Sequence, residues 1–132
     1  MTTNQSDLFI AAFNAMAAAA HETARAKGFW RQRTNIETAC AAFGLESAAR
    51  KMIDSQLREL IVSELAEACE GDRKDLRDDK IPEFSMVEAE LADAIIRIGD
   101  YAEARGLRVA EALVAKMRFN EGREQMHGGK QF

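Results

Sequence analysis

The chain has 132 residues, of which 47% are hydrophobic and 30% charged, with a formal net charge of -4 and one proline. This length favours a single domain over residues 1–132, and the apolar content excludes global disorder. The negative charge disfavours non-specific binding to nucleic acid or anionic membranes. Abundant alanine with few aromatic and β-branched residues predicts an all-α fold. Cys40 and Cys69 follow no metal-binding spacing and are expected to be reduced thiols in a cytoplasmic protein.

The N-terminal third of the chain is predicted to form two helices. The first is capped near Ser6, after a terminal segment that is expected to fray, and ends at Gly28. Its apolar stretch, 8–20, is too short to span a bilayer and follows no basic segment, so no membrane partner is expected. The aromatic pair after Gly28 is placed in a turn. A capping-box pattern at residues 34–37 then opens a short helix that ends at Gly44.

Three further helices are predicted toward the C-terminus. Their expected ranges are about 46–70, 83–105 and 108–121. The first of them is expected to stop at Gly71, before a charged loop at 72–82. A basic, glycine-rich tail occupies residues 122–132. Four principal helices with mostly short connections predict a four-helix-bundle-like fold.

The most informative pattern is a pair of acidic motifs, Glu64-Leu65-Ala66-Glu67 and Glu90-Leu91-Ala92-Asp93. The i, i+3 spacing in each motif projects both carboxylates from one side of a helix. The intervening segment is long enough for a loop and a return helix, which would bring four carboxylates together across a helix–helix groove. Clustered, partly buried carboxylates repel one another unless a cation lies among them. Hard oxygen ligands predict Mg²⁺, with Mn²⁺ as the other candidate.

A helical wheel separates the four acids by position. Glu64 falls inside the apolar stripe of its helix, where a leucine would pack better, and Glu67 lies at the edge of that stripe. Glu90 and Asp93 lie along one flank of the apolar stripe of the next helix. Acidic pairs in helical proteins are usually solvated, but the position of Glu64 favours a metal site. Other acids, including Asp100, are interpreted as ordinary surface charge.

A third motif lies downstream: Lys116-Met-Arg-Phe-Asn120-Glu-Gly-Arg123, followed by His127-Gly128-Gly129-Lys130. Together with the acidic pairs it resembles the MazG-like branch of the all-α NTP pyrophosphohydrolases. Their pattern is Glu-x-x-Glu, a spacer, Glu-x-x-Asp and then Lys-x-x-x-Asn-x-x-Arg. The resemblance covers about residues 56–132. It implies a homodimeric or homotetrameric helical enzyme that uses Mg²⁺ to hydrolyse a nucleoside triphosphate to monophosphate and pyrophosphate, for nucleotide-pool control or house-cleaning.

The same resemblance implies a role for each matching residue. The residues implied to bind the metal and act in catalysis are Glu64, Glu67, Glu90 and Asp93. The residues implied to bind phosphate or sugar are Lys116, Asn120, Arg123 and Lys130. Which carboxylate activates the water stays open, because acids that share a metal titrate as a coupled set.

The N-terminal segment carries a second resemblance. His21 and Trp30 look like the base-binding histidine and tryptophan of dCTP pyrophosphatase-type members. An indole stacks well on a base and an imidazole can hydrogen-bond to it, whereas the structural alternative is a core tryptophan and a surface histidine. Residues 31–55 look like an extension relative to compact members. Arg97 stands where those enzymes often have a tyrosine, so the preferred base stays open.

Wide apolar stripes, including an alanine-rich first helix, exceed what one bundle of this size would cover. They predict at least a homodimer, with a site that borrows residues from a neighbouring subunit. The alternative function is a non-catalytic helical interaction module whose acidic pairs face solvent or a partner. Under that alternative, Glu64→Leu stabilises the fold and Mg²⁺ leaves the melting temperature unchanged, since only a ligand of the folded state raises apparent stability.

Overall fold

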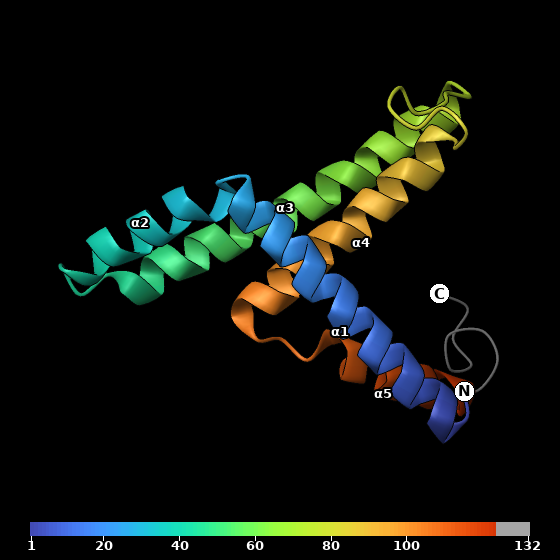
Figure 1. The fold of residues 1–132 in the computed structure, drawn as a ribbon, viewed down its shortest axis with the longest axis horizontal. Helices are drawn as coiled ribbons and strands as arrows, with labels where there is room; N and C mark the ends of the chain where they lie inside the picture. The colour runs from blue at the N-terminus through green and yellow to red at the C-terminus, as the bar shows by residue number, and fades with distance from the viewer. Residues whose placement is uncertain (124–132) are drawn as a thin grey trace.

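The computed structural model describes residues 1–123, and this part of the chain is all-helical, as predicted (Figure 1). Its helices are α1 (Thr3–Ala26), α2 (Phe29–Ala41), α3 (Glu46–Arg73), α4 (Met86–Arg105) and α5 (Val109–Glu121). Among these five helices, none combines the length and the hydropathy that crossing a bilayer requires.

The longest helix, α3, organises the arrangement. α2 packs along its first half and α4 returns along its second half, so that α3 and α4 form an extended pair (Figure 1). α1 packs across α4, and α5 lies beside the N-terminal part of α1. The groove between α3 and α4 is therefore approached from one side by α1 and the start of α2.

The N-terminal helix boundaries differ from the expected ones. Thr2, not Ser6, caps α1: its hydroxyl accepts from the Gln5 N–H at 3.2 Å, and the Gln5 side chain accepts from the Thr2 N–H at 2.8 Å. Ser6 is buried within the first turns of the helix. Gly28, with a φ of +85°, makes the turn in a single residue, so the following aromatic pair opens α2 instead of lying in a loop. The pattern at 34–37 lies inside α2 and caps nothing.

Two glycines allow helices to approach closely. Gly71 was expected to end α3, but the helix continues to Arg73, and Gly71 is buried against Met86. A Cβ at Gly71 would lie 2.7 Å from the Cβ of Met86, closer than side chains tolerate. Gly99 in α4 similarly faces Ala17 of α1, where a Cβ would lie 3.1 Å from the Ala17 Cα. These contacts set the spacing of α4 from both of its neighbours.

A partly buried ion-pair network anchors the first half of α3. Arg105 of α4 donates to Asp54 of α3 at 2.7 Å and to Glu37 of α2 at 2.5 Å. The adjacent apolar core contains Trp30, Ile53 and Leu57. Residues 31–55 therefore pack on the rest of the chain through specific contacts.

Candidate metal and nucleotide site

Three of the four predicted acids meet between α3 and α4. Carboxylate oxygens of Glu64, Glu90 and Asp93 all lie within 4.8 Å of one another. Glu64 and Glu90 are buried, at 6% and 8% exposure, as the wheel predicted for Glu64 but not for Glu90. The fourth acid, Glu67, is exposed and lies outside this group, although it lines the same cavity. Three oxygen ligands at this spacing suit a hard divalent cation.

The cluster concentrates negative charge in a partly dehydrated place. The pKa of Glu90 is raised to about 7, mainly by burial and in addition by its hydrogen bond to Glu64 and by the charges of Glu67, Glu64 and Asp93. The raised pKa indicates that the cluster lacks the positive counter-charge that would keep all of its carboxylates ionised. A cation placed among these oxygens would supply that charge.

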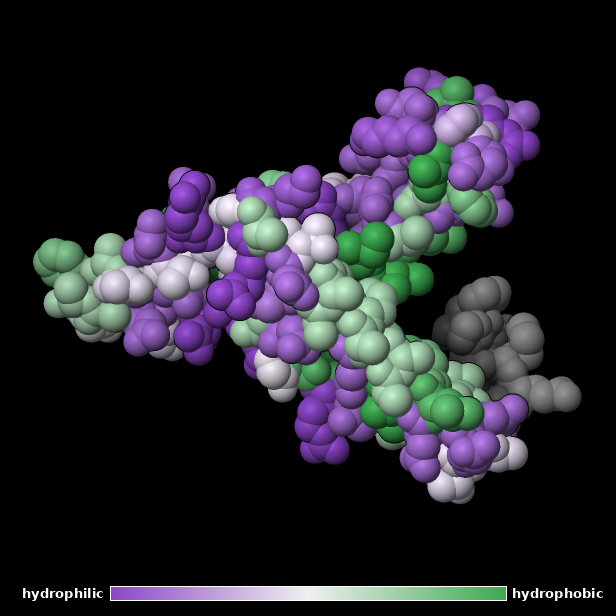
Figure 2. Space-filling view, in the orientation of Figure 1, coloured by the Kyte–Doolittle hydropathy of each residue, from purple (hydrophilic) through white to green (hydrophobic). Residues whose placement is uncertain are grey.

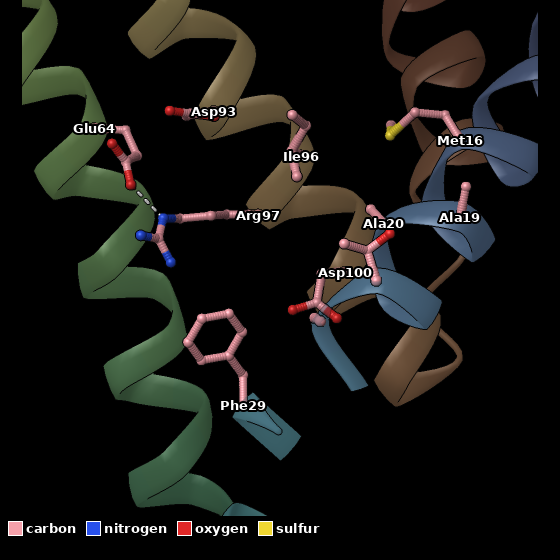
Figure 3. A pocket seen from close by; sticks show the side chains of 11 residues that line it. Met16, Ala19, Ala20, Phe29, Glu64, Asp93, Ile96, Arg97 and Asp100 are labelled. Carbon is pink, nitrogen blue, oxygen red and sulfur yellow. Dashed lines mark hydrogen bonds and ion pairs between the residues drawn. The ribbon is translucent and has the colours of Figure 1, made fainter. Parts of the chain in front are cut away.

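Arg97 supplies part of the compensation from α4. Its Nε donates to Glu64 Oε1, across the helix pair, and Figure 3 shows the side chain reaching from α4 to the carboxylate on α3. The sequence motifs predicted no role for this arginine. The i, i+4, i+7 spacing of Asp93, Arg97 and Asp100 was the available signal, because it puts all three side chains on one face of α4.

Two cavities meet at the acidic cluster. One, of about 790 Å³, is lined by the acids and by charged residues of the loop between α3 and α4, including Arg77 and Lys80. The other, of about 510 Å³, lies between α1 and α4 and is mostly apolar. Its apolar lining comes from Met16, Ala19, Ala20, Ala24, Phe29 and Ile96. Figure 2 shows apolar surface over α1 and beside the place where α1 crosses the α3–α4 pair.

The structure brings His21 and Trp30 together, but through an acid that the sequence analysis assigned to the surface. The Trp30 indole N–H donates to Asp100 Oδ1 at 2.8 Å, and His21 Nδ1 lies 2.7 Å from the same oxygen. The two rings meet edge to face, with centroids 5.3 Å apart. Asp100 is half-buried and lines the apolar cavity, so its assignment as surface charge was wrong.

Trp30 lies in the core, as the structural alternative to a base-stacking role has it. It is 8% exposed, packs with Ile53 and Leu57, and has the guanidinium groups of Arg33 and Arg105 at 5.0 and 5.6 Å from its ring. Its neighbour Phe29 is 63% exposed and lines the apolar cavity. Phe29 is therefore the aromatic ring that is available to a ligand in that cavity (Figure 3).

The predicted phosphate-binding residues of α5 and of the segment just after it lie apart from the acids within one chain. Lys116, Asn120 and Arg123 are exposed, and α5 packs against α1. Lys116 and Arg123 flank the exposed ring of Phe119, at 5.4 and 5.9 Å from its centroid. Within residues 1–123, no side chain of α5 lines either cavity at the acidic cluster. Lys130 lies outside the described residues.

Comparison of the chain with protein-family models, with curated proteins and with solved structures finds no match.

Proposed function

We propose that this chain is a Mg²⁺-dependent nucleoside triphosphate pyrophosphohydrolase of the MazG-like kind, which hydrolyses an NTP or dNTP to the monophosphate and pyrophosphate. The observation that carries the proposal is the meeting of buried Glu64 and Glu90 with Asp93 at the junction of a charged and an apolar cavity. Buried carboxylates in contact are unfavourable unless a cation binds them. An adjacent apolar cavity fits a ligand with an uncharged ring at one end and anionic groups at the other.

The donor set fits Mg²⁺ by its chemistry: carboxylate oxygens only, on two helices held at a fixed spacing. When bound, Mg²⁺ would neutralise phosphate charge and favour deprotonation of an attacking water. Glu64, Glu90 and Asp93 would hold the ion, and Glu67 at the cavity edge would orient the water. One carboxylate of this coupled group would accept the proton of the water.

The apolar cavity would hold the base. Exposed Phe29 offers a stacking surface, and base–aromatic stacking is tolerant of base identity. Asp100, held in place by His21 and Trp30, offers a carboxylate to the edge of the base. In this arrangement His21 and Trp30 act through Asp100 as positioning residues.

The exposed basic residues of α5 fit a site shared between copies of the chain. We propose a homo-oligomer in which Lys116, Asn120 and Arg123 of a neighbouring copy approach the phosphates. This explains why a segment with the family-like Lys-x-x-x-Asn-x-x-Arg spacing lies apart from the acids in a single chain.

Product analysis tests the function directly. The protein is incubated with the eight common NTPs and dNTPs plus modified forms, in Mg²⁺ or Mn²⁺, and products are separated by chromatography. We expect pyrophosphate and a monophosphate from at least one substrate, abolished by EDTA and by Glu64→Gln. Glu59→Gln, an exposed acid on the same helix, serves as the matched control and should retain full activity. No turnover across the panel would overturn the proposal.

The second candidate is a non-catalytic helical interaction module. Two observations favour it: Arg97 already compensates Glu64, and many large apolar side chains are exposed. The two functions make opposite predictions for Mg²⁺, which raises the melting temperature of an enzyme with this site and leaves that of the module unchanged.

A further inference from the structure

Arg97 is one of the side chains that lie where the two cavities join. The side chains that line both cavities are Glu64, Asp93, Ile96 and Arg97. A third cavity, of about 310 Å³, is lined by Arg97 together with Phe29, Arg33 and Asp100. A ligand with its ring in the apolar cavity and its anionic groups at the acids would therefore lie close to Arg97.

Its present contacts leave most of the guanidinium free to bind another group. Among the described residues, Arg97 donates one hydrogen bond, from Nε to Glu64, and its side chain is 42% exposed. A guanidinium has five N–H donors and pairs with phosphate in a bidentate way. Arg97 is therefore able to reach an anion in either cavity by rotating about its own side-chain bonds.

We propose that Arg97 exchanges partners during substrate binding. In the free protein it is the counter-ion of Glu64, and with substrate present it turns to a phosphate group of the nucleotide. This inference rests on the proposed function. Its physical basis is competition, because a divalent cation among the acids repels a guanidinium held at one of those same acids, while a phosphate at the junction attracts it.

The exchange predicts effects of opposite sign in a single variant. Removing the arginine removes a competitor of the metal at Glu64, so Mg²⁺ alone should bind more tightly. The same change removes a phosphate ligand, so the nucleotide should bind more weakly. A purely structural role for Arg97 predicts that both affinities fall together, because loss of helix pairing would disorder the whole site.

Calorimetric titration measures both affinities without requiring turnover. The first titration adds Mg²⁺ alone to wild-type protein and to the variants Arg97→Gln, Arg97→Lys and Arg58→Gln. The second titration adds the α,β-imido analogues of dATP, dCTP, dGTP and dTTP to the same four proteins in saturating Mg²⁺. Arg58 also links α3 to α4, through the Tyr101 hydroxyl at 3.0 Å, and is exposed, so it is the matched control.

For Arg97→Gln we expect Mg²⁺ to bind about fivefold or more tightly. We expect the best-bound analogue to bind about tenfold or more weakly, because the variant loses a charge-assisted hydrogen bond to phosphate. Arg97→Lys keeps the charge without the bidentate fork, so Mg²⁺ affinity should stay near wild type while analogue affinity falls severalfold. Arg58→Gln should change neither. If Arg97→Gln does not fold, by circular dichroism, Arg97→Lys carries the test.

Shifts of both affinities in the same direction, or no shift, would overturn the exchange, as would wild-type protein that binds none of the analogues. The proposed function fails separately, through absence of turnover in the nucleotide panel. Wild-type protein that hydrolyses a nucleotide while its Arg97 variants show unchanged affinities would overturn the exchange alone.

Discussion

The indole N–H of Trp30 donates a hydrogen bond of 2.8 Å to Asp100 Oδ1. This bond joins the start of α2 to the C-terminal half of α4. His21 of α1 contacts the same oxygen, so one carboxylate holds three helices. Asp100→Ala leaves a buried N–H without an acceptor, which we expect to lower the free energy of unfolding by about 1–3 kcal/mol. Asp100→Asn keeps an acceptor oxygen and should lose less. Urea unfolding measures both, and equal stability of Asp100→Ala and wild type would contradict this account.

Phe29 and Trp30 are adjacent in sequence, but their substitutions should have different effects. Phe29→Ala removes an exposed ring, so stability should change by about 0.5 kcal/mol or less, while nucleotide binding weakens by about 1–3 kcal/mol through lost stacking. Trp30→Ala removes a core side chain and should cost about 3–5 kcal/mol of stability. Paired measurement of KM and of the urea midpoint separates them. An unchanged KM in the Phe29→Ala variant would contradict a role for Phe29 in binding the nucleotide.

The raised pKa of Glu90, about 7 instead of 4.5, makes stability depend on pH in a defined direction. The folded protein holds this proton more tightly than the unfolded chain does, so the stability of the metal-free protein should fall as pH rises through this interval. Mg²⁺ needs the ionised carboxylate, so its stabilising effect should grow over the same interval. Melting temperatures in EDTA and in Mg²⁺, at about pH 5.5 and about pH 8, test both trends.

Glu90→Gln provides the control for that measurement. It cannot ionise, so the metal-free variant should lose this component of the pH dependence and be more stable than wild type at about pH 8. It should also lose stabilisation by Mg²⁺. A Mg²⁺-induced rise in melting temperature that is larger at the lower pH would contradict the assignment of Glu90 to the metal site.

The exposed surface predicts self-association. The chain exposes 9723 Å², whereas a globular monomer of this mass exposes about 6,900 Å². Leu91 and Ile95, both exposed, stand i, i+4 apart on α4 and form a continuous apolar strip. We expect at least a dimer by sedimentation at micromolar concentration, and a monomer for the double variant Leu91→Lys, Ile95→Lys. A monomeric wild-type protein would contradict the expectation.

Local patterns predicted the helices well, because each depends on neighbours in sequence. The stop at Gly106 and the number of helices follow from such patterns. The start of α4 was predicted wrongly although its signal is local: Ser85 and Glu88 form a capping box, and the helix begins at Met86 instead of about 83. Boundaries failed elsewhere where tertiary contacts decide, as at Gly71, whose missing side chain serves packing and not helix termination.

The acidic cluster could be predicted because i, i+3 spacing and the wheel position of Glu64 are visible in sequence. The partners of Asp100 and Arg97 could not, since they come from helices far away along the chain. Trp30 and Phe29 show the same limit: adjacent aromatic residues in a turn or a helix start look equivalent until the packing of α2 on α3 buries one of them.

The contact of Gly71 with Met86 lies outside the acidic cluster, but it belongs to the same helix pair and contributes to the register of α4 along α3. It restrains how far α4 can be displaced along the axis of α3. A slip of one helical turn would move the second acidic motif by about 5.4 Å relative to the first, which exceeds the 4.8 Å that now spans the three carboxylates. The close approach that Gly71 permits therefore helps to keep the three carboxylates near one another.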